Sequence, residues 1–446
     1  MICPLYEISK HCSKKIFLHD DSQKWTYGEW NKQAQGIASW IKKNTVVEGS
    51  RIAIYNRSAF STTSWLMACA RTKTILVILS NKETEQTIAN LRSKFSLDHL
   101  IDPSFQDPKP LEVTNSCYID PEAPLTMLFT SGSTGLPKAV IHSFQNHWSS
   151  ARFSNQNIEF KEDQNWLLSL YLWHIGGLSI IFRTLFGKAK TTVKSSSKNI
   201  AYHLKNYSIT HLSLVAVQLS ELLISRTIFP NLKAVLVGGG PIPPDLIHQA
   251  VKAQIPIHCT YGMTELCSQL TTTAPNASPK ELKSAGSPLG DWNVLISADG
   301  EICVRGSPLF LGYWNGSTIT PALSLDGYFH TNDIGYIEDE HLFPTGRKDQ
   351  MFISGGENIH PEEIEKVLGA FVDLAIVVPI PDERYGSRPV AFLKGSWRLE
   401  EIVKHLNDTL PSFKHPDYFL QWPDSISAKK ASRSALQHLA FSMLCQ

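Results

Sequence analysis

A short loop rich in hydroxyl residues and glycine is the part of this sequence best suited to hold a phosphate. It follows an apolar run and is itself followed by Lys138. Backbone N–H groups and hydroxyls can converge there on phosphate oxygens, and the lysine adds positive charge. The loop does not fit the Walker pattern, and a plain serine- and glycine-rich surface loop is the alternative. Its residues are Thr130, Ser131, Gly132, Ser133, Thr134 and Gly135.

Further polar motifs follow this loop, and their order along the chain is informative. They are Thr260-Tyr-Gly-Met-Thr-Glu265, Gly300-Glu-Ile-Cys-Val-Arg-Gly306, Asp326-Gly-Tyr-Phe-His-Thr-Asn-Asp333, Gly346-Arg-Lys-Asp349 and Ile353-Ser-Gly-Gly-Glu-Asn-Ile-His-Pro361. With the loop, this series resembles the acyl-adenylate-forming superfamily, which includes acyl-CoA synthetases, adenylation domains and luciferases. The resemblance covers residues 128–368, continues more weakly to 436 and is loose over the first 120 residues.

Within that superfamily the sequence is most similar to the o-succinylbenzoate–CoA ligases of menaquinone biosynthesis. The compact length of 446 residues also looks like those ligases rather than the longer fatty-acyl and acetyl-CoA synthetases. The segments that carry this likeness are Phe144–His147, Leu170–Leu178, Leu236–Pro241, Tyr261–Gln269 and Ser284–Gly286.

The superfamily resemblance implies a nucleotide site. The Thr130–Gly135 loop and Lys138 match the family's pyrophosphate-holding loop, and Glu265 matches its magnesium ligand. A carboxylate suits that role because Mg²⁺ prefers hard oxygen ligands and shares them with phosphate. Thr264 is expected to hydrogen bond the α-phosphate. The positions that match the adenine site are Gly238, Gly239, Gly240, Tyr261, Gly262 and Met263, with an ordinary strand-end turn as the alternative for the glycines.

Asp333 matches the aspartate that accepts hydrogen bonds from both ribose hydroxyls, a task suited to a carboxylate. The family usually has glycine before it, whereas this chain has Asn332. Asparagine is among the residues that best tolerate a left-handed backbone, so we expect the turn to survive. Arg347 matches an arginine near ribose and phosphate. Asp349 falls on the family's hinge position, with a plain exposed turn as its alternative.

The C-terminal lysine has two candidate registers. Lys430 stands six residues before Leu436 and is assigned as the catalytic lysine that bridges phosphate and acyl oxygens, with Lys429 as the competing assignment. Gly355 and Gly356 match a loop that lines the pantetheine tunnel, where missing side chains leave room.

Two further residues match the acyl end of the site. His174 matches a gate residue between the acyl pocket and the thiol path, with a lone core histidine as the alternative. Arg183 is a lone cation on an apolar stretch, and burial there would demand an anion. The unactivated second carboxylate of o-succinylbenzoate would meet that demand. The alternative is an arginine that reaches solvent from a helix end.

These matches predict an ATP-dependent acid–CoA ligase that uses ATP, Mg²⁺ and CoA and makes o-succinylbenzoyl-CoA. Three alternatives remain open. The chain could be another aryl- or acyl-CoA ligase of the same fold, a carrier-loading adenylation protein, or a catalytically silent protein that binds a nucleotide or acyl group. Intact Glu265, Asp333 and Arg347 and a positioned Lys430 argue against the silent protein.

Alternating strand-like and helix-like segments must position these residues. Apolar runs such as Arg51–Tyr55, Thr74–Leu79, Trp166–Leu172 and His211–Val217 are typical of strands covered on both faces. The expected fold is α/β: a large N-terminal domain with mainly parallel β-sheets flanked by helices, plus a small mobile α+β C-terminal domain. The predicted domains are 1–346, for binding AMP and the acyl group, and 350–446, a lid, with a hinge at 347–349.

Composition narrows the class of protein. The sequence is 42% hydrophobic and 19% charged, and its formal net charge is +1. These values exclude a disordered chain and show no electrostatic footprint for nucleic acid. No apolar run is long enough for a membrane span and no secretory signal is visible, so a cytoplasmic protein is expected. The eight cysteines show no zinc-binding spacing and are expected to be mostly buried thiols. A homodimer is left open.

Overall fold

The computed structural model describes residues 1–44, 46–130, 137–225, 227–354, 357–382, 384–424, 426, 428 and 432–444. The chain folds into two compact units. Unit 1 comprises Met1–Ile242, Leu246–Asn293 and Arg305–Phe329, and unit 2 comprises Pro243–Asp245, Val294–Val304 and His330–Gln446. Both units mix strands and helices, so the predicted α/β class is confirmed. The domain boundary and hinge at 347–349 stay predictions, because compactness alone does not locate an axis of rotation.

The first sheet of unit 1 carries the candidate phosphate loop. Its strands are β3 (Arg51–Ile54), β4 (Ile75–Ile78), β5 (His99–Ile101), β6 (Pro124–Thr130), β7 (Lys138–Ser143), β17 (Gly312–Trp314) and β18 (Ile319–Pro321). They lie in the order β18-β17-β7-β6-β4-β3-β5. The β4, β3, β5 and β6 pairings are parallel, whereas β7, β17 and β18 add antiparallel strands at one side. All four residues of β4 are buried, as its continuous apolar run predicts.

The second sheet of unit 1 carries the candidate adenine site. Its strands are β1 (Ile16–His19), β2 (Lys24–Thr26), β8 (Asn165–Leu168), β9 (Lys190–Val193), β10 (His211–Leu214), β11 (Ala234–Val237), β12 (Ile257–Tyr261), β13 (Thr271–Thr272) and β14 (Ser287–Pro288). They lie in the order β14-β13-β12-β11-β10-β8-β9-β1-β2. The pairings from β12 through β1 are parallel, and β2, β13 and β14 are antiparallel edges.

Two predicted strands are shorter than their apolar runs. β8 stops at Leu168 and β10 stops at Leu214. After β10 the Val215 N–H donates to the Gln218 side chain at 3.1 Å and a helix begins at once. An apolar run therefore crosses from strand to helix without a change in composition, which hydrophobicity alone cannot reveal.

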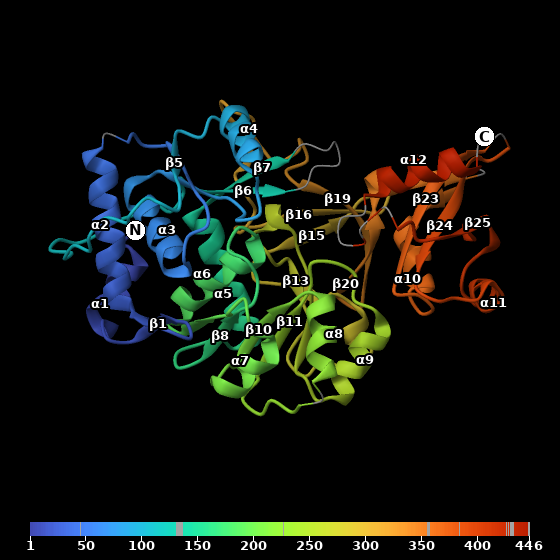
Figure 1. Ribbon diagram of the computed structural model, residues 1–446, viewed down its shortest axis with the longest axis horizontal. Helices are drawn as coiled ribbons and strands as arrows, with labels where there is room; N and C mark the ends of the chain where they lie inside the picture. The colour runs from blue at the N-terminus through green and yellow to red at the C-terminus, as the bar shows by residue number, and fades with distance from the viewer. Residues whose placement is uncertain are drawn as a thin grey trace. The chain divides into compact units, whose positions relative to one another are not determined.

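Helices lie beside both sheets of unit 1 (Figure 1). They are α1 (Pro4–Cys12), α2 (Tyr27–Lys43), α3 (Ala59–Thr72), α4 (Glu85–Phe95), α5 (Phe144–Ile158), α6 (Ile175–Gly187), α7 (Ile200–Asn206), α8 (Ala216–Ile224) and α9 (Pro244–Lys252), with short 3₁₀ turns η1 (Thr264–Leu266) and η2 (Glu281–Lys283). A capping box begins α2. Thr26 Oγ1 accepts from the Glu29 N–H at 3.2 Å, and Glu29 Oε2 accepts from the Thr26 N–H at 2.7 Å.

Unit 2 carries the candidate ribose and hinge residues. Its strands are β15 (Asn293–Ile296), β16 (Glu301–Arg305), β19 (Phe329–Glu338), β20 (His341–Arg347), β21 (Phe352–Ser354), β22 (Glu357–Ile359), β23 (Leu374–Asp382), β24 (Gly386–Lys394) and β25 (Tyr418–Gln421), of which β15, β16 and β19 each have one terminal residue in unit 1. They form the sheets β15-β16-β19-β20, β21-β22 and β23-β24-β25. Its helical elements are η3 (Lys348–Gln350), α10 (Pro361–Leu368), α11 (Leu399–Thr409), η4 (Ser412–Lys414) and α12 (Arg433–Leu444).

None of the helices in the part of the chain that the structure describes has both the length and the apolar character needed to cross a membrane.

Candidate active site

The two ends of the candidate phosphate loop are held by a strand pair. Thr130 ends β6 and Lys138 begins β7, and the two residues are partners in the antiparallel register. This pairing fixes where the loop leaves and rejoins the sheet. Ser131, Gly132, Ser133, Thr134 and Gly135 lie outside the described residues, so their phosphate contacts stay predictions.

Glu265, the candidate magnesium ligand, is tied to that loop through Tyr313. The Glu265 side chain is buried at 5% exposure, and its Oε1 accepts a 2.7 Å hydrogen bond from the Tyr313 hydroxyl. Lys138 Nζ lies 5.2 Å from the centroid of the Tyr313 ring. Since Tyr313 pairs with Val140 on β7, the carboxylate and the lysine meet around one aromatic ring. Hard oxygen donors beside a phosphate-binding loop are what a magnesium–phosphate pair requires.

The turn that presents Thr264 and Glu265 depends on Gly262. A Cβ atom on Gly262 would lie 1.6 Å from the Ser268 carbonyl oxygen, so only glycine fits. His142 Nε2 lies 2.7 Å from the Thr264 carbonyl oxygen, to which it must donate. Burial lowers the pKa of His142 to about 4, so the ring is neutral at pH 7. The turn is therefore fixed by close packing and by a neutral histidine.

The candidate adenine residues lie at the carboxyl ends of neighbouring parallel strands. Tyr261 is the last residue of β12, and Gly238–Gly240 follow the end of β11. A Cβ atom on Gly238 would lie 2.7 Å from Thr260 Cγ2, and Gly239 has a φ of +81°. Ligands of open α/β sheets bind at this edge. An ordinary strand-end turn and an adenine site would both have this geometry, so the assignment of Gly238–Gly240 to adenine stays a prediction.

Arg183 is buried in the middle of α6, at 1% exposure. Its Nη2 donates to Gln269 Oε1 at 2.7 Å and to Ser268 Oγ at 3.2 Å, and its guanidinium lies 5.1 Å from the Trp166 ring centroid. Burial lowers the pKa of the guanidinium to about 9. The predicted burial is confirmed, and the alternative in which the arginine reaches solvent is wrong. Gln269 and Ser268 are neutral, so these two contacts leave the cation without a compensating negative charge.

His174 is the exposed N-cap residue of α6, so the alternative of a core histidine is wrong. Nearby protein atoms remove part of the hydration of the His174 ring although the residue is exposed, and this effect and the neighbouring Lys82 cation lower the pKa of His174. The preceding residues Tyr171 and Trp173 stack at a centroid distance of 4.2 Å and line a pocket of about 330 Å³.

In unit 2, Asp333 and Arg347 face each other across β19 and β20. They are register partners, and Arg347 Nη1 donates to Asp333 Oδ1 at 3.1 Å. Arg347 also donates to both carboxylate oxygens of Asp349, at 2.9 Å and 3.2 Å. Asn332 has a φ of +61°, so the expectation that asparagine preserves the left-handed turn is confirmed. The candidate ribose aspartate and the candidate hinge aspartate thus share one arginine.

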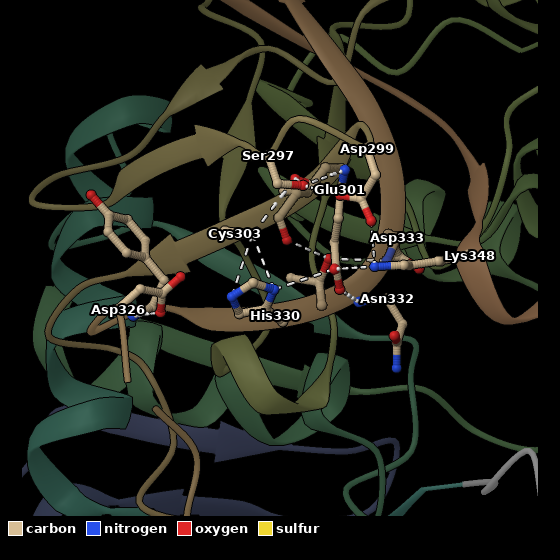
Figure 2. A network of polar contacts seen from close by, with 12 residues as sticks. Ser297, Asp299, Glu301, Cys303, Asp326, His330, Asn332, Asp333 and Lys348 are labelled. Carbon is tan, nitrogen blue, oxygen red and sulfur yellow. Dashed lines mark hydrogen bonds and ion pairs between the residues drawn. The ribbon is translucent and has the colours of Figure 1, made fainter. Parts of the chain in front are cut away.

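A polar network beside this pair was not predicted from the sequence. Figure 2 shows Glu301 on β16 surrounded by Lys348, Asn332 and His330. Glu301 Oε2 accepts from Lys348 Nζ at 2.9 Å and lies 3.2 Å from His330 Nδ1, and Oε1 accepts from the Asn332 N–H at 2.9 Å.

The cysteines of the described region are free thiols, and most are buried, as expected. One of them, Cys303, joins Glu301 and His330 in a group whose donor atoms lie within 4.8 Å of one another. Hydrogen bonds already engage both carboxylate oxygens, so the contacts of this group need no metal ion to explain them.

Several predicted residues lie outside the described part of the chain. They are Gly355, Gly356, Lys429 and Lys430, so the tunnel and the catalytic lysine stay predictions. The residues that follow the lysines are anchored: Arg433 donates to both carboxylate oxygens of Glu365, and Leu436 is fully buried.

A family model and the curated relatives of this chain point to the same enzyme family. Residues 91–314 match the model of the AMP-binding enzyme family. The 2-succinylbenzoate–CoA ligase of Bacillus cytotoxicus is 30% identical over 95% of this chain and 96% of its own length, and that of Escherichia coli K12 is 33% identical over 94% of each.

Solved structures agree with these matches. The o-succinylbenzoate CoA synthetase (MenE) of Bacillus subtilis in complex with the acyl-adenylate intermediate OSB-AMP is 27% identical, with a TM-score of 0.86 over 94% of both chains. Wild-type Escherichia coli MenE with a bound analogue of OSB-AMS is 29% identical, with a TM-score of 0.84 over 99% of both chains. The resemblance seen in the motifs is confirmed, and this chain belongs to the AMP-binding enzyme family as a relative of its 2-succinylbenzoate–CoA ligases.

Proposed function

We propose that this chain is an adenylate-forming ligase that joins o-succinylbenzoate to CoA, a step of menaquinone biosynthesis. The observation that carries this proposal is similarity over almost the whole chain to enzymes named for that reaction. The buried Arg183 supports the substrate, because a dianionic acid would bring it a negative charge.

The reaction has two displacement steps. A carboxylate oxygen of the acid attacks the α-phosphorus of ATP, and pyrophosphate leaves with the electrons of the broken P–O bond. The sulfur of CoA then attacks the acyl carbon of the mixed anhydride, its proton is lost, and AMP leaves. Most of the rate enhancement comes from orientation and charge stabilisation, since the protein forms no covalent bond to the substrate.

The residues around Tyr313 are proposed to bind the phosphates. Lys138 and the Thr130–Gly135 loop would hold the pyrophosphate portion of ATP, with Thr264 bonded to the α-phosphate. Glu265 would hold Mg²⁺, which when bound supplies positive charge to the phosphate oxygens. Tyr313 would fix the carboxylate by its hydrogen bond to Oε1. Lys430 would stabilise the negative charge that develops during adenylation.

The nucleoside is assigned to two groups of residues. Tyr261, Met263 and the Gly238–Gly240 turn would enclose adenine at the end of β11 and β12. Asp333 would accept hydrogen bonds from the ribose hydroxyls, and Arg347 would keep that carboxylate oriented through its hydrogen bond to Oδ1.

The acid is assigned to the surroundings of the buried Arg183. Its guanidinium would bind the ring carboxylate of o-succinylbenzoate, directly or through Ser268 and Gln269. Binding of that carboxylate would repay the cost of a buried, uncompensated cation. The same charge would then select against monocarboxylic acids that leave it unpaired.

CoA transfer is assigned to the remaining predicted residues. The small domain would rotate about Asp349 and withdraw Lys430, and the thiol would pass Gly355 and Gly356 to reach the acyl carbon beside His174. We further propose that the chain works in the cytoplasm. We also propose that it forms a homodimer, which light scattering would test.

The test is pyrophosphate release from ATP and Mg²⁺ with and without CoA. We expect CoA-dependent thioester formation with o-succinylbenzoate. Turnover of a different acid would support a CoA ligase but contradict the assignment to menaquinone biosynthesis. Adenylation without use of CoA would indicate a carrier-loading protein.

A further inference from the structure

Glu301 is a buried carboxylate to which the proposed mechanism gives no task. It is 3% exposed and lies at the start of β16. A buried carboxylate is costly unless hydrogen bonds compensate for lost hydration. Here three donors surround it, and their hydrogen bonds outweigh the effect of burial and hold the pKa of Glu301 below its ordinary value. The group is therefore an ionised acceptor at pH 7.

Two donors to Glu301 lie on one side of the Asp333–Arg347 pair, one next to each member of the pair. Asn332, whose N–H donates to Oε1, is the residue before Asp333. Lys348, whose ammonium donates to Oε2, is the residue after Arg347. Because Asp333 and Arg347 are register partners on β19 and β20, one carboxylate joins both strands next to that pair (Figure 2).

The backbone next to Asp333 needs such an anchor. Asn332 is in the left-handed region, which costs free energy for a residue with a side chain. Thr331 provides a second anchor: its Oγ1 donates to the Ile302 carbonyl at 2.8 Å and accepts from the Asp333 N–H at 3.1 Å. The turn before Asp333 is thus pinned to β16 by Glu301 and by Thr331.

We propose that Glu301 is a positioning residue for nucleotide binding: it acts through the Asn332 N–H and Lys348 to aim the Asp333 carboxylate at the ribose hydroxyls. The inference rests on the proposed function, since it takes Asp333 as the ribose ligand. In this proposal Glu301 acts only through these neighbours and is assigned no contact of its own with the nucleotide or the acid.

The Glu301→Gln substitution tests this with little change in shape. The amide has one oxygen that accepts and an NH2 group that only donates, so it cannot accept from Asn332 on one side and from Lys348 on the other. The matched control is Glu338→Gln, a change at an exposed glutamate at the end of β19, the strand that carries Asn332 and Asp333. Both variants are compared with the wild type by isothermal titration calorimetry with AMP and with 2′,3′-dideoxy-AMP, neither of which requires the acid.

We expect Glu301→Gln to weaken AMP binding about tenfold, since a hydrogen bond to a charged group is lost. The loss is expected to fall below about twofold for 2′,3′-dideoxy-AMP, because the hydroxyls that Asp333 binds are missing. Glu338→Gln is expected to leave both affinities unchanged. A wild-type protein that binds no AMP would count against the proposed function itself rather than against Glu301.

Two results would overturn the inference. One is an equal loss for both nucleotides, which would make Glu301 a structural residue only, and the other is no loss for either. Thr331→Val supplies a second measurement if Glu301→Gln does not fold. It removes the hydroxyl that accepts the Asp333 N–H hydrogen bond. If this variant lost the same affinity for AMP as for 2′,3′-dideoxy-AMP, that result would also contradict positioning of Asp333 by this turn.

Discussion

The Tyr313 hydroxyl donates a 2.7 Å hydrogen bond to Glu265 Oε1, although 48 residues separate the two in the chain. The contact arises because β17 pairs with β7, so Tyr313 projects from the strand next to the one that begins at Lys138. A buried carboxylate with a fixed hydrogen bond keeps one orientation, and a metal ligand with fixed orientation costs less free energy to organise when the ion binds.

Tyr313→Phe is expected to lower kcat/KM for adenylation about tenfold and to raise the Mg²⁺ concentration needed for half-maximal rate. The loss follows from an unpaired oxygen on buried Glu265, worth about 1–3 kcal/mol. Pyrophosphate release as a function of Mg²⁺ measures both effects. Tyr118→Phe, at an exposed tyrosine, is the control. An unchanged magnesium dependence would contradict the role given to Tyr313.

Arg183→Met is expected to reduce kcat/KM for o-succinylbenzoate by about a hundredfold, because the ring carboxylate loses its buried partner. The melting temperature should fall only modestly, because Gln269 Oε1 loses a buried donor while removal of the uncompensated charge offsets part of that loss. Arg152→Met, at an exposed arginine of α5, serves as the comparison. Equal losses with o-succinylbenzoate and benzoate would show that Arg183 does not read the second carboxylate.

Gly262→Ala is expected to abolish measurable adenylation, because the new methyl group would collide with the Ser268 carbonyl and displace Thr264 and Glu265. The overpacking should also cost about 1–3 kcal/mol of stability. Activity assays and urea unfolding report the two effects. Gly369→Ala, where an added Cβ would meet the nearest atom at 3.4 Å, should leave both intact. Full activity in Gly262→Ala would refute the tight turn.

The stability of the protein is expected to fall between pH 6.5 and pH 4. Burial lowers the pKa of His19, His142 and His211 from 6.5 to about 4 in the folded state. Because the unfolded chain binds protons in this window and the folded chain does not, the free energy of unfolding decreases as the pH falls. Each histidine should remove about 1.8 kcal/mol between pH 7 and pH 5. Urea unfolding at the two pH values measures the sum, and equal midpoints would contradict neutral buried histidines.

The sequence predicted the parts of the fold that depend on local patterns. The apolar run Thr74–Leu79 needs only its own residues to form a covered strand, and β4 is present there with all four residues buried. The ends of β8 and β10 were placed too late, because apolar residues continue into the following segments. Where a chain turns depends on packing that a hydrophobic run does not encode.

In the candidate site too, the features that depend on local sequence were predicted, and those that depend on distant strands were not. Arg183 was expected to be buried because a lone cation interrupts an apolar run, and it is. Tyr313 and Glu301 were not expected as supporting residues, since their partners come from strands far along the chain. The Gly312–Trp314 segment carries a tyrosine in a short apolar stretch, but only strand pairing shows that its hydroxyl meets a carboxylate.

Pyrophosphate release with purified protein, ATP, Mg²⁺ and CoA tests the central claim most directly. The acids to compare are o-succinylbenzoate, benzoate, 4-chlorobenzoate and octanoate. We predict that the kcat/KM for o-succinylbenzoate is at least about a hundredfold above that for the other acids, because only its ring carboxylate can pair with the buried Arg183 guanidinium. Equal or better turnover of a monocarboxylic acid would contradict the account, because the charge of Arg183 would then have no part in choosing the substrate.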